Sequence, residues 1–142
     1  MSGHIFFKHR WYGFDDGLYA AARLLEILSR AKRDGQDPSR LLDDLPNAIC
    51  TPELHLHTAE GENFSLMEKL KNEASFAGAS DVIKIDGVRV EYPDGFGLAR
   101  PSNTTPVIVL RFEADTDAAL ARIQAEFRRA LLGVKPDAKL PF

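Results

Sequence analysis

Cysteine, long apolar runs and blocks of like charge are all scarce in this sequence of 142 residues. Cys50 is the only cysteine, which argues against a disulfide framework or a zinc site built on several thiolates and is typical of a reducing compartment. No stretch approaches the roughly 18 apolar residues of a membrane span, and no charged leader opens the chain. We therefore expect a soluble, cytoplasmic protein that does not bind membranes.

Neither positive nor negative charge dominates the sequence. Eighteen Lys and Arg residues stand against 21 Asp and Glu, which gives a net charge of −3, and the two signs are mixed along the chain. A nucleic-acid-binding surface needs a basic stripe that releases counterions from the phosphate backbone, and this sequence has none. We therefore expect no nucleic-acid partner, although a few donors would suffice to bind a small anion.

The groups that carry out phosphoryl chemistry are missing as well. There is no Asp-Gly-Asp type of carboxylate cluster that would hold a magnesium ion, and no serine in a context typical of a phosphorylated nucleophile. His55 and His57 fall on one face of a predicted strand, but two ligands without a third nearby favour a solvated face over a metal centre. We expect no metal site in this chain.

The apolar residues that are present, 44% of the total, predict one ordinary core and an N-terminal appendage. The dense apolar and aromatic side chains of residues 5–12 are typical of a buried strand and its turn. Helical spacing follows over about 15–29. The polar stretch 30–40 and a short predicted helix over 41–45 place a domain boundary here.

The rest of the sequence alternates between strand and helix patterns. In order, these are a strand over 53–58, a helix from about 63 to 77, a hairpin over 83–92 with its turn at Asp86-Gly87, strands over 97–100 and 107–112, and a helix over about 115–134 with the apolar stripe Leu120, Ile123, Phe127, Leu131 and Val134. This order predicts the α+β class, with an antiparallel four-stranded sheet covered on one face by two helices.

The connection between the last two strands is the most informative local feature. Arg100 presents a planar fork of donors, and Ser102, Asn103, Thr104 and Thr105 add hydroxyl and amide groups. A proline at either end would lower the cost of ordering the loop. This set of donors suits a phosphate, whose oxygens are all acceptors. The alternative is a connecting loop rich in small polar residues that turn well.

Two further features near the N-terminus could be functional. His4 could move a proton near neutral pH if it faced a ligand, or it could be an ordinary terminal histidine. The run Lys8-His9-Arg10 is cationic, and we interpret it as a solvated turn.

Two groups of motifs appear in a familiar order along the chain. The first comprises Met1–His4, Phe6–Lys8 and Arg10–Gly17, and the second comprises Asp86–Val90, Tyr92–Gly95, Gly97-Leu98, Arg100, Ser102–Pro106 and Leu110–Ala114. The first group resembles the end of the third domain of bacterial phosphomannomutase/phosphoglucomutase, in the alpha-D-phosphohexomutase superfamily. The second group resembles the fourth domain of that family.

The resemblance implies a division of the chain into three parts. Residues 1–35 would be the strand and helix that end the third, sugar-binding domain, and residues 36–50 would be a hinge. Residues 51–142 would form the C-terminal phosphate-binding domain, whose fold in this family is similar to that of the TATA-box-binding protein.

The resemblance also implies an activity for the full-length enzyme. Members of this family interconvert the 1-phosphate and 6-phosphate of mannose or glucose through an active-site phosphoserine, a magnesium ion and a bisphosphorylated intermediate. The phosphoserine and magnesium loops belong to earlier domains, and neither pattern occurs here. We therefore expect a phosphosugar and the enzyme's other domains as partners, a monomeric enzyme, and no catalysis by this chain alone.

Individual roles carry over by position. The phosphate contacts implied are Arg100, Ser102, Asn103, Thr104 and Thr105. Ser2 matches a sugar-hydroxyl contact and His4 a residue beside the transferred proton. The family's Gly-Glu-Met-Ser-Gly-His loop begins here only at its Met, and Pro101 replaces the small residue expected after the arginine.

Two other functions remain open at this point. One is a stand-alone phospholigand-binding module without an enzymatic parent, against which the abrupt N-terminal strand argues. The other is a protein or nucleic-acid interaction domain that uses the broad sheet, against which the acidic balance argues.

Overall fold

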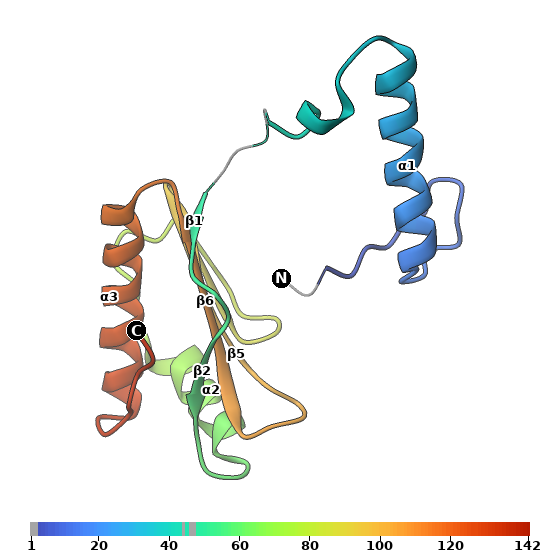
Figure 1. Cartoon of the computed structure of the whole chain (residues 1–142). Coiled ribbons are helices and arrows are strands. Elements are labelled where there is room, and N and C mark those ends of the chain that lie inside the picture. Colours follow the sequence, from blue (N-terminus) through green and yellow to red (C-terminus); the bar gives the residue numbers. More distant parts are fainter. Residues whose placement is uncertain (1–2, 44, 46–47) are drawn as a thin grey trace. The chain divides into compact units, whose positions relative to one another are not determined.

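The computed structural model describes residues 3–43, 45 and 48–142 (Figure 1). Its contacts divide the chain into two compact units, Met1–Pro46 and Asn47–Phe142.

The first unit is built on helix α1, Gly17–Arg33. The side chain of Asp16 caps the helix by accepting the N–H of Tyr19 at 2.9 Å. Basic side chains in the last turn complement the negative end of the helix dipole, namely Arg30, Lys32 and Arg33. The helix is about one turn longer than predicted. The prediction followed the apolar pattern, which ends before the basic residues of the last turn.

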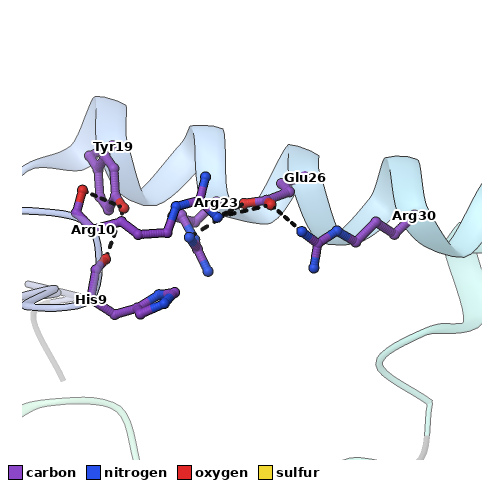
Figure 2. Close-up of polar contacts among 6 residues, drawn as sticks. All are labelled: His9, Arg10, Tyr19, Arg23, Glu26 and Arg30. Atoms are coloured by element: carbon purple, nitrogen blue, oxygen red, sulfur yellow. Dashed lines mark hydrogen bonds and ion pairs between the residues drawn. The ribbon is translucent and has the colours of Figure 1, made fainter.

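The cationic run at residues 8–10 forms a turn that is held against α1 (Figure 2). The hydroxyl of Tyr19 donates to the carbonyls of His9 and Arg10, at 3.0 and 3.2 Å. The Arg10 guanidinium donates to the Glu26 carboxylate at 3.2 Å, and this bond holds the pKa of Glu26 below its usual value. Two arginines of the helix itself lie beside the same carboxylate, Arg23 and Arg30.

Two predictions for this unit are wrong. Residues 5–12 form no strand, only a single bridge between Phe6 and Asp15, and Phe6 is 64% exposed. A strand needs a neighbouring strand for its backbone groups, and the described part of this unit supplies only that one pairing. The helix predicted over 41–45 is also not found: residues 41–43 form a turn and residue 45 a bend, while residue 44 lies outside the described residues. The 3-10 turn Pro38–Arg40 precedes them, and Asp37 caps it by accepting the N–H of Ser39.

The second unit contains an antiparallel sheet. Its strands are β1 Ile49–Cys50, β2 Leu54–His57, β3 Asp81–Ile83, β4 Val88–Tyr92, β5 Gly95–Pro101 and β6 Val107–Ala114. The strand β6 pairs with β5 on one side and with both β1 and β2 on the other, and β4 and β3 follow β5. Each strand pattern of the sequence is present, with β3 and β4 as the two arms of the predicted hairpin. The sheet has six strands and not the predicted four, because β1 also pairs with β6 and β3 lies beside β4.

Helices α2, Glu62–Glu73, and α3, Asp117–Val134, contact each other and the same strands, β5 and β6, and so cover one face of the sheet (Figure 1). The predicted α+β class is confirmed. The core between the layers contains Leu56, Val90 and Phe112 from the sheet, Leu66, Met67 and Leu70 from α2, and Ile123, Phe127 and Leu131 from α3. The Phe112 and Phe127 rings meet edge to face, 5.2 Å between centroids, a favoured aromatic geometry.

Two boundaries in this unit differ from prediction. Ala74 is extended and ends α2, so the predicted helix does not reach residue 77. In the first hairpin β3 ends at Ile83 and β4 begins at Val88, which makes the connection four residues long and leaves Ile85 within it 90% exposed. Apolar periodicity is compatible with either the predicted or the observed boundary in both cases. The packing partners of each segment decide where the helix and the strand end.

Candidate functional site

The loop between β5 and β6 is closed at its base by backbone hydrogen bonds. The N–H of Ser102 donates to the carbonyl of Val107 at 3.0 Å, and the N–H of Val107 donates to Thr105 at 2.8 Å. Thr58, just after β2, donates to the carbonyl of Pro106 through both its N–H and its hydroxyl, each at 2.9 Å. The loop is therefore held by its own two strands and by a third.

Inside the loop, the hydroxyl oxygen of Ser102 is the common acceptor. It accepts the N–H groups of Thr104 and Thr105, at 3.3 and 3.2 Å, and the hydroxyl of Thr105 at 3.0 Å. The Thr104 hydroxyl lies 3.3 Å from the same oxygen. Because the Ser102 oxygen is occupied as an acceptor, its own proton can be donated to Thr104 or to an anion.

The start of α2 lies against this loop. Asn63 is buried, with 2% of its surface exposed, and its amide Nδ2 donates to the carbonyl of Ser102 at 2.8 Å. A hollow of about 90 Å³ lies between helix and loop, lined by Glu60, Gly61, Asn63, Phe64 and residues 102–106. Four of the five predicted phosphate contacts therefore gather in one place, Ser102, Asn103, Thr104 and Thr105.

The fifth, Arg100, lies two residues before the loop and does not line the hollow as described. Strand alternation puts its side chain opposite Ala99 and away from the core, where 48% of it is exposed. Its guanidinium Nη1 stands 3.5 Å from a carboxylate oxygen of Asp86, a long and exposed pair. Such a pair leaves most of the guanidinium donors available to a ligand.

Asp86 is brought to Arg100 by the glycine that follows it. Gly87 has φ +99°, and a Cβ built there would lie 2.2 Å from the carbonyl oxygen of Ala99. Only glycine fits this close approach of the hairpin tip to β5. The dipeptide Asp86-Gly87 signals a turn in the sequence, but its proximity to Arg100 depends on the sheet.

The two histidines of β2 have no metal-binding arrangement around them. Both are exposed, and Nε2 of His55 lies 3.0 Å from the carboxylate of Glu53, a contact that lowers the pKa of that carboxyl. Within residues 3–43, 45 and 48–142, no group of three or more His, Cys, Asp or Glu is placed to hold a metal ion. Nor does any helix in those ranges have the length and apolarity to cross a membrane.

His4 belongs to the first unit, where its Nδ1 contacts the carboxylate of Asp15. A ring held in this way presents Nε2 on its other side. Ser2, the predicted sugar contact, lies outside the described residues. Sequence reasoning missed Asp15, Asp86 and Asn63 as partners of candidate residues, because each partner is distant in the chain.

Two family models match the chain in sequence order. The model of the phosphoglucomutase/phosphomannomutase C-terminal domain matches residues 57–130, which include the whole loop. The chain belongs to the phosphoglucomutase/phosphomannomutase family. The model of that family's alpha/beta/alpha domain III matches residues 1–49. The resemblance seen in the sequence is confirmed.

Individual members of the phosphoglucomutase/phosphomannomutase family are similar over most of the chain. A phosphoglucomutase of Neisseria gonorrhoeae is 59% identical over 132 residues, which are 92% of this chain and 28% of that protein. A phosphomannomutase/phosphoglucomutase of Pseudomonas syringae pv. tomato is 54% identical over all 142 residues, 30% of its length.

A crystal structure of a phosphoglucomutase/phosphomannomutase family protein from Burkholderia thailandensis matches all of this chain at 66% identity, with a TM-score of 0.87, and the chain covers 29% of it. The chain thus spans less than a third of the length of these relatives, and it matches the family's models of domain III and of the C-terminal domain.

Proposed function

We propose that this chain is the phosphate-binding C-terminal part of an enzyme that interconverts hexose 1-phosphate and hexose 6-phosphate. The loop at residues 100–105 holds the phosphate that is not being transferred. The observation that carries the proposal is the Ser102 turn, which is fixed at both ends yet exposes Asn103, Thr104 and Thr105 to solvent.

The chemistry of these groups supports an anionic ligand. Hydroxyl, amide and guanidinium groups can all donate to oxygens that only accept. Among the described residues, Arg100 has no contact stronger than the long one to Asp86. A doubly charged phosphate in bidentate contact would compete well with that single carboxylate. Because the loop is already hydrogen-bonded, little ordering entropy opposes binding.

Holding a phosphate remote from the reacting one would contribute to catalysis by positioning. Binding energy from that phosphate keeps the other end of the sugar in line for transfer. We assign residues 51–142 to this role, residues 36–50 to a hinge that closes the site, and residues 1–35 to the sugar-binding domain. Magnesium and the phosphoserine would be supplied by other parts of a monomeric, cytoplasmic enzyme.

The N-terminal residues would complete the sugar site. Ser2 would contact a sugar hydroxyl, and His4 would take part in proton transfer through Nε2 while Asp15 holds Nδ1.

Amide chemical shifts of the full 142-residue chain, followed as glucose 1-phosphate is added, test the proposal. We expect weak, saturable shifts centred on residues 100–105 and no turnover of the sugar phosphate. Absence of loop shifts at millimolar ligand would overturn it. If an oligonucleotide instead shifts amides across the sheet and leaves those of residues 100–105 unchanged, the result would favour an interaction domain.

The variant Arg100→Ala sharpens this experiment. We expect it to weaken phosphate binding by about 1.5–3 kcal/mol, the range for a hydrogen bond to a charged group, with folding unchanged. Arg89→Ala is the matched control, because Arg89 is another arginine of the sheet but pairs with Glu91 and stacks on Phe96. Equal weakening by both variants would reduce the effect to general charge, and a large loss of stability in Arg100→Ala would make Arg100 structural.

A further inference from the structure

Asn63 is the only buried polar residue among the described core positions of the second unit. It lies in the first turn of α2, whose N-cap, Gly61, offers no side chain to the helix. Its Nδ2 donates to the carbonyl of Ser102, 39 residues away in the sequence, while its Oδ1 is buried without a partner among the described residues.

A buried amide with one unpaired oxygen is unfavourable, because water would have satisfied that oxygen in the unfolded chain. Packing alone would be served better by leucine, as at Leu66 and Leu70 on the same helix. The bond to Ser102 is therefore the physical reason for an amide at this position.

The hydrogen bond from Asn63 also orients the peptide group between Ser102 and Asn103. The carbonyl of Ser102 and the N–H of Asn103 belong to one planar trans peptide, in which C=O and N–H point in opposite directions. Since the carbonyl is turned towards Asn63 and α2, the N–H of Asn103 must point away from the helix. Asn103 is an exposed residue, so a ligand can reach this N–H from solvent.

We propose that Asn63 is a positioning residue of the phosphate site: by holding the Ser102 carbonyl, it aims the backbone N–H of Asn103 at the bound phosphate. This inference rests on the proposed function of the loop and adds to it a residue outside the loop and a backbone donor within it. An N–H fixed in advance binds an oxyanion more tightly than one that must reorient first.

Asn63→Leu removes the donated bond and keeps an apolar side chain of similar size. Titration of the full chain with inorganic phosphate, followed by amide shifts, gives the affinity and the response of Asn103 together. We expect the affinity to fall about tenfold, as the loss of one such hydrogen bond implies. We also expect the Asn103 amide to lose most of its phosphate-induced shift while Thr105 keeps its own.

Leu70→Val is the matched control, because it removes one buried methylene from the same helix without touching the loop. It should leave phosphate affinity within twofold of wild type. Equal affinity of Asn63→Leu and wild type would overturn the inference and leave the proposed function standing. Equal weakening by Leu70→Val would also overturn it, by reducing the effect to stability. If phosphate causes no amide shifts in the loop of the wild-type chain, both proposals are refuted.

Asn63→Asp supplies a readout that a purely structural role would not change, and it serves if the leucine variant fails to fold. A protonated carboxyl can donate to the Ser102 carbonyl, and an ionised one cannot. With sulfate as the probe, a dianion throughout this range, we expect near wild-type affinity at pH 5 and about tenfold weaker binding at pH 8.

Wild type measured at both pH values corrects for the ionisable groups nearby. These are Glu60, which lines the same hollow, and Glu62, which is paired with Lys135. The same pH dependence in wild type and Asn63→Asp would overturn the inference.

Discussion

Gly97 shows at the scale of a single residue how tightly the two layers of the second unit meet. It lies in β5 opposite Val90 and Phe112, and a Cβ built on it would fall 2.3 Å from the ring of Phe127. The ring can reach the core only because this strand position has no side chain. A glycine in a strand is unfavourable by itself, so its presence here follows from the aromatic packing above it.

Gly97→Ala should therefore destabilise the second unit by about 1–3 kcal/mol, the usual cost of overpacking a core. Gly133→Ala is the control with the opposite sign, because no atom lies within 4 Å of a Cβ at this position of α3. It should be neutral or stabilising by up to about 1 kcal/mol. Urea unfolding followed by circular dichroism measures both. A neutral Gly97→Ala would mean that the Phe127 ring moves freely.

At the scale of elements, the start of α2 and the end of α3 are held together by one ion pair. The ammonium of Lys135 donates to Glu62 Oε1, and Glu62 Oε2 accepts the N–H of Ala59 at 2.8 Å. Glu62 thus closes the turn before its own helix and ties it to the other. The hydrogen bond from Lys135 lowers the pKa of the Glu62 carboxyl, and the same bond raises the pKa of Lys135.

The signs of these shifts predict how the pair affects stability. A lowered carboxyl pKa stabilises the fold above the usual value of 4.5, and this contribution disappears as the pH falls through the lower folded-state pKa. A raised ammonium pKa stabilises below 10.5, and this contribution disappears as the pH rises above it. Between these limits both groups are charged and the pair is complete.

We expect Glu62→Gln to be less stable than wild type at pH 7, with a difference that shrinks below about pH 4.5. Urea unfolding over pH 3–7 measures this difference. Lys135→Gln and the double variant complete a thermodynamic cycle, in which the double variant should lose less than the sum of the singles. A difference independent of pH would contradict this prediction, because it would show that the charge of Glu62 does not contribute to stability.

At the scale of the whole molecule, the two units bury apolar side chains to very different extents. The second unit encloses a continuous core from the sheet and both helices. In the first unit, Ala31 is the only buried residue of α1, and Leu18 and Leu25 are 87% and 65% exposed. Stability follows the apolar area removed from water, so the first unit should open more readily.

Trp11 is the only tryptophan of the chain, and it stacks on Tyr19 within the first unit. We therefore expect its fluorescence to change at a lower urea concentration than circular dichroism of the sheet. Amide exchange should likewise be at least about 100-fold faster in α1 than in β6, which corresponds to roughly 3 kcal/mol in local opening free energy. Coincident transitions would indicate one cooperative unit.

Local patterns in the sequence were enough to predict most elements of the second unit and the donors of its loop. The stripe of α3 has the expected inner face, with Ile123, Phe127 and Leu131 fully buried, because its helical period is a property of neighbouring residues. The alternation in β2 likewise buries Leu56 and exposes His55. The loop donors were visible because they lie within a few residues of one another.

Only the tertiary structure decided what those elements hold in place. Asn63 meets Ser102, and Gly97 makes room for Phe127, through contacts between residues 30 or more positions apart. Residues 5–12 have a strand-like composition, yet in the described structure they form a single bridge. The sequence by itself determined the local periodicity and the chemistry of the loop. The path of the chain determined which distant groups meet, because a hydrogen bond or a close contact depends on position in space.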